Sequence, residues 1–204
     1  MPALDTKQCF RRAERLMGNQ FLLTAVAADS GCAGSALNAA IAEIQRVEKL
    51  LTTFSDDSET TRINAAAGVG PVPVSAEVFQ LIERAQRISG LTQGAFDLSY
   101  GSLDKRFWNF DKNMTALPDA DEARQLVRLI DYRNIVLNPA AQTIFLKEKG
   151  MRIGFGGIGK GYAAERAKQV LVQHGISSGV VNASGDLCAW GAQPDGKPWT
   201  VGIA

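Results

Sequence analysis

Apolar residues recur at spacings of three and four in several segments of the chain, and this is the period of an amphipathic helix. The first such segment is residues 35–54, whose apolar positions fall on one helical face. A second helix is predicted from Ser75, a typical N-cap residue, to Gly90, a typical C-terminal residue. Residues 118–131 predict a third helix because acidic residues cluster in its first turn. Residues 162–173 predict a fourth.

Short runs of strand-forming residues lie between these segments. Residues 18–29 predict one strand, and residues 133–156 predict consecutive hairpins because Asn and Pro, then Lys and Gly, interrupt them. Residues 178–191 and 198–204 predict further strands on either side of a turn. Helices mixed with antiparallel strands in this order predict an α+β fold, with antiparallel sheets and flanking helices. We found no internal repeat or linker, so residues 1–204 are predicted to form a single domain.

Composition narrows the function classes. With 46% hydrophobic residues in 204, the chain can bury a real core, and a net charge of +1 gives no support to nucleic-acid binding. No apolar run is long enough for a transmembrane segment, and the first residues lack the apolar core of a signal peptide, so we expect a soluble chain without an export signal. The odd number and wide spacing of Cys9, Cys32 and Cys188 predict unpaired thiols.

Residues 154–161 contain five glycines in eight positions and lead into the fourth predicted helix. They satisfy the dinucleotide pattern G-x-G-x-x-G, but a Rossmann fold would place it in a first βαβ unit and not beyond residue 150. They also contain G-x-x-x-x-G-K, yet Gly161 follows where a P-loop needs Ser or Thr. The glycines could simply permit a tight turn. A helix N-terminus beside Lys160 favours a phosphate-bearing ligand.

Five ordered blocks, from "LMGNQF" near the N-terminus to "VVNASGDLCAWGAQPDGKPWTVGI" at the end, resemble the ApbE-type FAD:protein FMN transferases. The other three are "VEKLLTTFSDDSETTRIN", "TQGAFDLSYGSLDKRFW" and "FGGIGKGYAAER". The resemblance implies an α+β flavin transferase that uses Mg²⁺ to cleave FAD at its pyrophosphate. FMN would pass to a threonine hydroxyl of a target protein, with release of AMP.

The resemblance also implies partners and a location. The target would be a protein with an acceptor threonine, of the redox-pump or electron-transfer subunit type. The family is commonly placed at the periplasmic face or as an inner-membrane lipoprotein, whereas a chain that truly lacks a signal would be cytoplasmic. Two alternatives remain open: a non-catalytic FAD-binding module, and an FAD pyrophosphatase that passes FMN to water.

Residue by residue, the resemblance assigns the catalytic role to Lys160 and a metal contact to the backbone carbonyl of Gly159. FAD contacts are assigned to Met17, Phe54, Asp97, Ser99, Gly156, Gly157, Lys160, Asn182 and Asp186. Phe54 stands where the family has Tyr, and it keeps a ring that can stack on a base. Read from the residues alone, Asp97 and Asp186 could serve only as turn residues beside glycines, and Asn64 could be only a helix-terminal residue.

The sequence also departs from the family at other positions. Gly154 stands where the family has an acidic residue, and Ser184 replaces one glycine of the later block. The family's C-terminal histidine motif, with its Asp and Thr metal ligands, has no counterpart before Ala204. We therefore expect a C-terminally truncated domain whose activity is weak or absent. The one histidine, His174, precedes Gly175 and is predicted to end the fourth helix.

Overall fold

The computed structural model describes residues 7–103 and 120–202, and the chain divides into two compact units. Unit 1 is formed by residues 1–48 and 158–204, and unit 2 by residues 49–157. The chain passes between them within one helix and within the glycine-rich segment. Each unit is described by itself, and the single domain over residues 1–204 stays a prediction.

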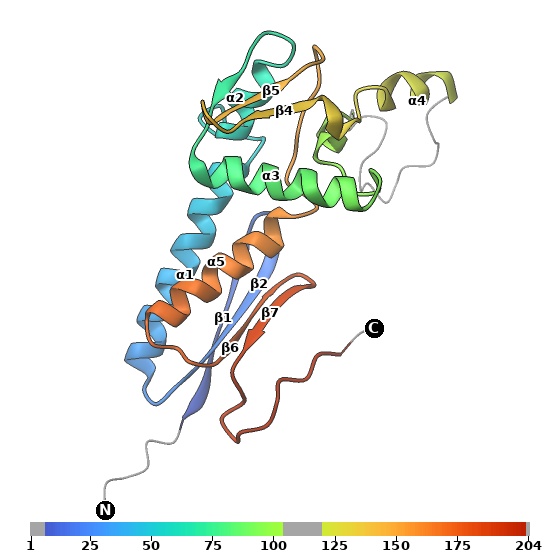
Figure 1. Cartoon of the computed structure of the whole chain (residues 1–204). Helices are drawn as coiled ribbons and strands as arrows, with labels where there is room; N and C mark the ends of the chain where they lie inside the picture. Colours follow the sequence, from blue (N-terminus) through green and yellow to red (C-terminus); the bar gives the residue numbers. More distant parts are fainter. Residues whose placement is uncertain (1–6, 104–119, 203–204) are drawn as a thin grey trace, which may run out of the picture. The chain divides into compact units, whose positions relative to one another are not determined.

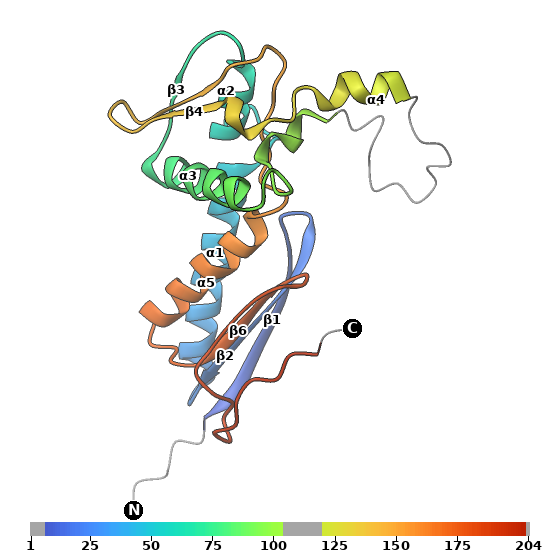
Figure 2. The same cartoon turned by 45° about the vertical axis from the view of Figure 1, so that its right-hand side comes forward.

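Unit 1 contains a four-stranded antiparallel sheet in the order β1-β2-β6-β7 (Figure 1). The strands are β1 (Gln8–Leu16), β2 (Asn19–Ala27), β6 (Gly179–Ala183) and β7 (Asp186–Trp190). Helices α1 (Ser30–Leu51) and α5 (Gly159–Gln173) cover the same face of this sheet, as both views show (Figures 1 and 2). The predicted α+β fold is confirmed, as is the strand in 18–29. Residues 178–191 are extended as predicted, but they form two strands, β6 and β7, joined by a turn at residues 184 and 185.

The core of unit 1 lies between this sheet face and the two helices. Every second residue of the central strands is fully buried there, and these residues are Phe21, Leu23, Ala25, Val181 and Ala183. Small residues, Ala36 and Ala40 on α1 and Ala163 and Ala167 on α5, are also buried and permit close packing.

An ion-pair network ties α1 to α5. The Glu43 carboxylate accepts from Arg46 and from Arg166, each at 2.8 Å. These two guanidinium groups, Arg46 foremost, lower the pKa of Glu43 to about 2.

Unit 2 contains a three-stranded antiparallel sheet in the order β3-β5-β4. Its strands are β3 (Val72–Pro73), β4 (Ile135–Asn138) and β5 (Thr143–Leu146). Its helices are α2 (Glu59–Ala65), α3 (Ala76–Leu91) and α4 (Ala120–Val127), with short 3₁₀ turns η1 (Leu98–Ser102) and η2 (Tyr132–Asn134). The hairpin β4–β5 confirms part of the predicted 133–156 region. Residues 118 and 119 of the third predicted helix lie outside the described residues.

Helix ends follow local capping chemistry, with one correction. Ser75 caps α3 as predicted, because its Oγ accepts from the amide of Val78 at 3.3 Å. The predicted end at Gly90 is wrong, since α3 continues through Leu91. A Schellman motif ends it: the left-handed residue after the C-cap is Gln93, with φ of 53°, and the amides of Gln93 and Gly94 donate to the carbonyls of Gly90 at 3.3 Å and Ser89 at 2.8 Å.

Two further boundaries differ from expectation. Helix α1 begins at Ser30 and not at residue 35, because the Asp29 carboxylate caps it by accepting from the amide of Cys32 at 2.8 Å. The predicted strand 198–204 is wrong for residues 198–202, which belong to no strand. Trp199 instead donates its indole N–H to the carbonyl of Trp190 at 2.9 Å. Residues 203 and 204 lie outside the described residues.

The predicted unpaired thiols agree with the structure, in which Cys9, Cys32 and Cys188 are all free. His174 is the C-cap of α5, as predicted, and Gly175 follows it with φ of 83°. Over the residues that the structure describes, no helix has both the length and the apolar character needed to cross a membrane.

Candidate functional site

One end of the unit 1 sheet gathers four of the predicted site residues. The turn between β1 and β2 and the turn between β6 and β7 lie at this same end, because Phe21 near the start of β2 pairs with Ala183 at the end of β6. Helix α5 also starts here, since Lys160 Nζ lies 3.4 Å from Asp186 Oδ2. The four residues are Met17, Lys160, Asn182 and Asp186.

The β6–β7 turn fixes the positions of Asn182 and Asp186. Its two central residues are Ser184 and Gly185, with φ of 56° and 105°, as in the tight hairpin turns that match strand twist. Asn182 Oδ1 accepts from the amide of Gly185 at 3.0 Å, which closes the turn. Asp186, the first residue after the turn, has a side chain that is 51% exposed and faces Lys160. Asp186 is therefore a turn-flanking residue that also forms an ion pair.

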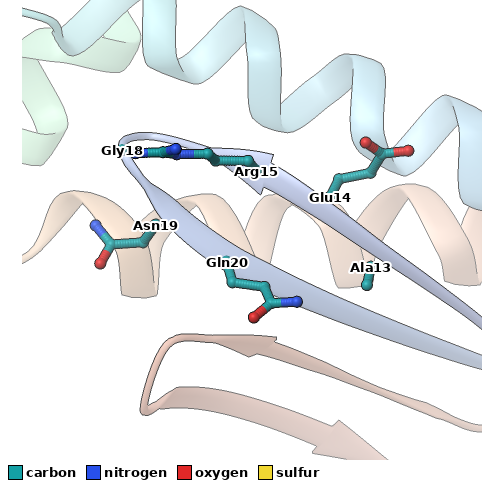
Figure 3. A pocket seen from close by; sticks show the side chains of 6 residues that line it. All are labelled: Ala13, Glu14, Arg15, Gly18, Asn19 and Gln20. Atoms are coloured by element: carbon teal, nitrogen blue, oxygen red, sulfur yellow. The ribbon is translucent and has the colours of Figure 1, made fainter.

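Met17 lies in the matching turn of the β1–β2 hairpin. Its φ is 52°, and its carbonyl accepts from Asn19 Nδ2 at 3.1 Å. Beside this turn is an open hollow of about 520 Å³ (Figure 3). The hollow is lined by Ala13, Glu14, Arg15, Gly18, Asn19 and Gln20.

The N-terminus of α5 carries backbone donors that the helix itself does not use. The first helical hydrogen bond runs from the amide of Tyr162 to the carbonyl of Ile158 at 3.0 Å, so the amides of residues 159–161 precede the intrahelical ladder. The N-cap residue, Ile158, provides no side-chain cap. With the Lys160 ammonium alongside, this helix end has the charge and donors that an anion requires.

The expected metal contact is the backbone carbonyl of Gly159. Gly159 is the buried first residue of α5. Magnesium prefers an octahedron of oxygen ligands, including carboxylates. Among residues 7–103 and 120–202, no group of three or more His, Cys, Asp or Glu side chains could hold a metal ion. The metal contact at Gly159 stays a prediction.

Asp97 and Ser99, in unit 2, are brought together as a hydrogen-bonded turn. Asp97 Oδ1 accepts from the Ser99 amide at 2.8 Å and from the Ser99 hydroxyl at 2.6 Å. Asp97 Oδ2 accepts from the amide of Tyr132 at 2.8 Å, which joins the two 3₁₀ turns. Both carboxylate oxygens thus serve the local fold, as the turn interpretation of Asp97 expects. Their predicted contact with FAD stays a prediction.

The other predicted residues of unit 2 lie near this turn or on an exposed loop. Gly157 packs against the ring of Phe96, because a Cβ built at Gly157 would lie 3.1 Å from Phe96 Cε2. Gly156 is exposed, and a Cβ built there would meet no atom within 4 Å. Phe54 follows α1, and 85% of it is exposed. An exposed ring of this kind suits stacking on a base, although the structure assigns it no ligand.

The strand expected directly before the glycine segment does not form, and this correction reveals a side chain that was not predicted. Residues 151–155 have no strand partner. Their backbone groups bond to the side chains of Asn64 and Ser102 instead. Asn64 lies next to the last residue of α2, in agreement with its interpretation as a helix-terminal residue. Ser102 had no detectable signal, because a lone serine in a loop follows no periodic pattern.

Cys188 also lies on the helix-facing side of the unit 1 sheet. Its thiol donates to Glu165 Oε2 at 3.0 Å. Burial, and then the neighbouring carboxylate, raise the pKa of Cys188 to about 11. The thiol is therefore protonated at neutral pH and is not a nucleophile.

The chain belongs to the ApbE family, whose model matches residues 17–204. It is 33% identical over 188 residues to a FAD:protein FMN transferase of Klebsiella pneumoniae, covering 92% of this chain and 56% of that protein. It is 30% identical over 211 residues to a FAD:protein FMN transferase of Treponema pallidum, covering 95% of this chain and 57% of that protein. The chain thus spans about half the length of the curated relatives that it matches.

The fold of the family is also shown by a solved relative. The crystal structure of the ApbE protein of Thermotoga maritima superposes with a TM-score of 0.85 at 26% identity, covering 97% of this chain and 63% of that one. The resemblance read from the sequence is thereby confirmed at the level of family and fold.

Proposed function

We propose that this chain forms the FAD-binding part of a FAD:protein FMN transferase. The observation that carries the proposal is the start of α5 in unit 1, where the amides of residues 159–161 precede the helical ladder and the Lys160 ammonium pairs with Asp186. FAD presents a pyrophosphate, and helix N-termini with a neighbouring lysine bind such groups well. The names of the two relatives described above supply the class of reaction.

The reaction is a phosphoryl-group displacement. The hydroxyl oxygen of an acceptor threonine forms a bond to the phosphorus of the FMN half, and the bond from that phosphorus to the bridging oxygen breaks. AMP leaves with the electron pair, and the hydroxyl proton passes to solvent or a base. Negative charge spreads over the phosphoryl oxygens as the bonds exchange, so positioned donors lower the barrier.

Lys160 is suited to provide such a donor. Its ammonium carries three N–H groups, and the ion pair with Asp186 engages one side of it. At 3.4 Å, with Asp186 half exposed, this pair contributes at most about 1 kcal/mol. A doubly charged pyrophosphate can therefore compete for Lys160, while Asp186 keeps the side chain near the end of α5 when no ligand is bound.

The remaining expectations rest on the resemblance. We propose a protein partner with an acceptor threonine, of the redox-pump or electron-transfer type, and a location at the periplasmic face. Magnesium would supply further neutralisation of phosphate charge. No step above depends on magnesium.

The first test is FAD binding by flavin fluorescence, with and without Mg²⁺, for the wild type, Lys160→Ala and Lys168→Ala. Lys168 is a matched control, because it lies on the same helix, is 29% exposed against 25% for Lys160, and also pairs with a carboxylate. Losing one charge-assisted contact should weaken binding roughly tenfold or more in Lys160→Ala alone. Equal weakening in both variants, or no binding by the wild type, would overturn the proposed site.

A second test separates transfer from hydrolysis. The chain is incubated with FAD, Mg²⁺ and a threonine-containing acceptor peptide, and the products are resolved by mass spectrometry. A peptide heavier by the mass of bound FMN would support transfer. Free FMN with unmodified peptide would favour the pyrophosphatase, and intact FAD would favour the binding module.

A further inference from the structure

The segment that leads into the glycine loop has the burial pattern of a strand but lacks a strand partner. Met151 and Ile153 are fully buried and Phe155 is 5% exposed, whereas Arg152 between them is exposed. Such alternation normally requires a hydrogen-bonded neighbour, because buried backbone groups must be paired. Two polar side chains supply that pairing.

The side chain of Asn64, near the end of α2, forms hydrogen bonds with the backbone of Ile153. Its Oδ1 accepts from the Ile153 amide at 2.7 Å, and its Nδ2 donates to the Ile153 carbonyl at 3.0 Å. A carboxamide has one acceptor and one donor side by side, so it reproduces the paired bonds that a neighbouring strand would make. Asn64 is 89 residues away in sequence and is committed to this single residue.

The side chain of Ser102, at the end of η1, likewise forms hydrogen bonds with the backbone of Arg152. Its Oγ accepts from the Arg152 amide at 2.9 Å and donates to the Arg152 carbonyl at 3.0 Å. The Gly154 amide then donates to the carbonyl of Leu98 at 3.0 Å. The backbone of three consecutive residues, 152–154, is therefore held by hydrogen bonds from groups outside the segment.

We propose that Asn64 and Ser102 are positioning residues that hold the glycine loop of unit 2 ready for the ligand. Together with their targets Arg152 and Ile153 they form what we term the backbone clamp. A pairing strand would run on past Gly154 and would occupy the exposed groups of Gly156 and Gly157. Here the pairing, made by Asn64, Ser102 and the Leu98 carbonyl, ends at residue 154 and leaves those groups open, which is what a phosphate-binding loop needs. The expected effect of the clamp on FAD binding rests on the proposed function.

The test uses the full chain and two measurements that do not depend on each other. Hydrogen exchange by mass spectrometry follows peptides covering residues 151–158, and flavin fluorescence follows FAD binding. The variants are Asn64→Ala, Ser102→Ala and the conservative Ser102→Thr, which keeps the hydroxyl. Asn138→Ala is the matched control, because Asn138 caps a backbone amide of the β4–β5 turn, that of Ala141, at 3.1 Å in the same unit.

In Asn64→Ala and Ser102→Ala we expect exchange in residues 151–158 to be at least about tenfold faster, while the urea midpoint still shows a folded chain. FAD should bind about tenfold more weakly, because the loop must be ordered on binding. Ser102→Thr should show the exchange rate and the FAD affinity of the wild type. Asn138→Ala should change neither the exchange rate nor the FAD affinity.

Several results would overturn the inference. Unchanged exchange in residues 151–158 would show that the clamp does not hold the segment. Faster exchange with unchanged FAD affinity would show a purely structural contact, and so would a failure of Ser102→Thr to rescue binding. If Asn64→Ala does not fold, the two Ser102 variants decide the question. If the wild type binds no FAD, the proposed function fails, while the exchange measurement still decides whether the clamp exists.

Discussion

Gly101→Ala tests the closest backbone approach beside the glycine loop. A Cβ built at Gly101 would lie 2.6 Å from the carbonyl carbon of Ile153 and 2.8 Å from the amide nitrogen of Gly154. Both are backbone atoms, one in the clamp residue Ile153 and the other bonded to the Leu98 carbonyl, so neither can rotate away as a side chain would. Overpacking of this kind typically costs about 1–3 kcal/mol. Alanine also restricts the unfolded chain, which returns about 0.4–1 kcal/mol. We expect a net loss of about 1–2 kcal/mol.

The assay is urea unfolding followed by circular dichroism, with Gly154→Ala as the matched control. Gly154 lies on the opposite side of the same contact, yet a Cβ there would meet its nearest atom, Gly101 Cα, at 3.7 Å, which is ordinary contact. We expect the control to be neutral or slightly stabilised. If Gly101→Ala unfolds at the same urea concentration as Gly154→Ala, the close approach does not exist and the reasoning fails.

Three further predictions concern unit 1. Because the pKa of Glu43 is lowered to about 2, its ion pairs stabilise the fold above the ordinary pKa of 4.5 and are lost as pH falls towards 2. Between about pH 5 and about pH 3, the free energy of unfolding in urea should fall by about 1 kcal/mol more in the wild type than in Glu43→Gln. An equal fall in both proteins would contradict a stabilising role for the Glu43 ion pairs. Iodoacetamide at about pH 8 should modify exposed Cys32 well before Cys188, because the pKa of Cys188 is raised to about 11. Glu165→Gln should speed the labelling of Cys188 several-fold, as followed by mass spectrometry. Equal labelling rates of the two thiols would refute the raised pKa of Cys188. Ser184→Gly should raise thermal stability by up to about 1 kcal/mol, because φ of 56° strains an L-residue, and a lower melting temperature would argue against that turn.

The elements that local pattern predicted are those whose stabilising contacts lie within a few residues. Ser75 caps α3 through an amide three residues on, and His174 ends α5 next to Gly175. The core helices show their apolar period directly in the sequence. The turn at Asn182 could be anticipated for the same reason, since its hydrogen bond spans three residues.

Strand β1 could not be anticipated from pattern. Its residues, Gln8–Leu16, are mostly exposed or half-buried, and the run of arginines obscures any alternation. It is an edge strand, paired with β2 alone in this sheet, and charged residues are typical of protected edges. Its hydrogen bonds to β2 decide its conformation.

In the candidate site too, some features could be predicted from local sequence and others depend on contacts between distant residues. The amino-acid sequence alone determined the family and predicted a helix over residues 162–173 just after Lys160, whereas the structure shows that this helix begins three residues earlier, at Gly159. Only the tertiary structure decided that Asp186 pairs with Lys160, that both oxygens of Asp97 are used within the fold, and that Asn64 and Ser102 replace a strand partner for residues 152–154. The physical reason is sequence separation. Apart from the bond between Asp97 and Ser99, these contacts join groups that are 26 to 89 residues apart, and local propensity carries no information on which distant group will bond to them.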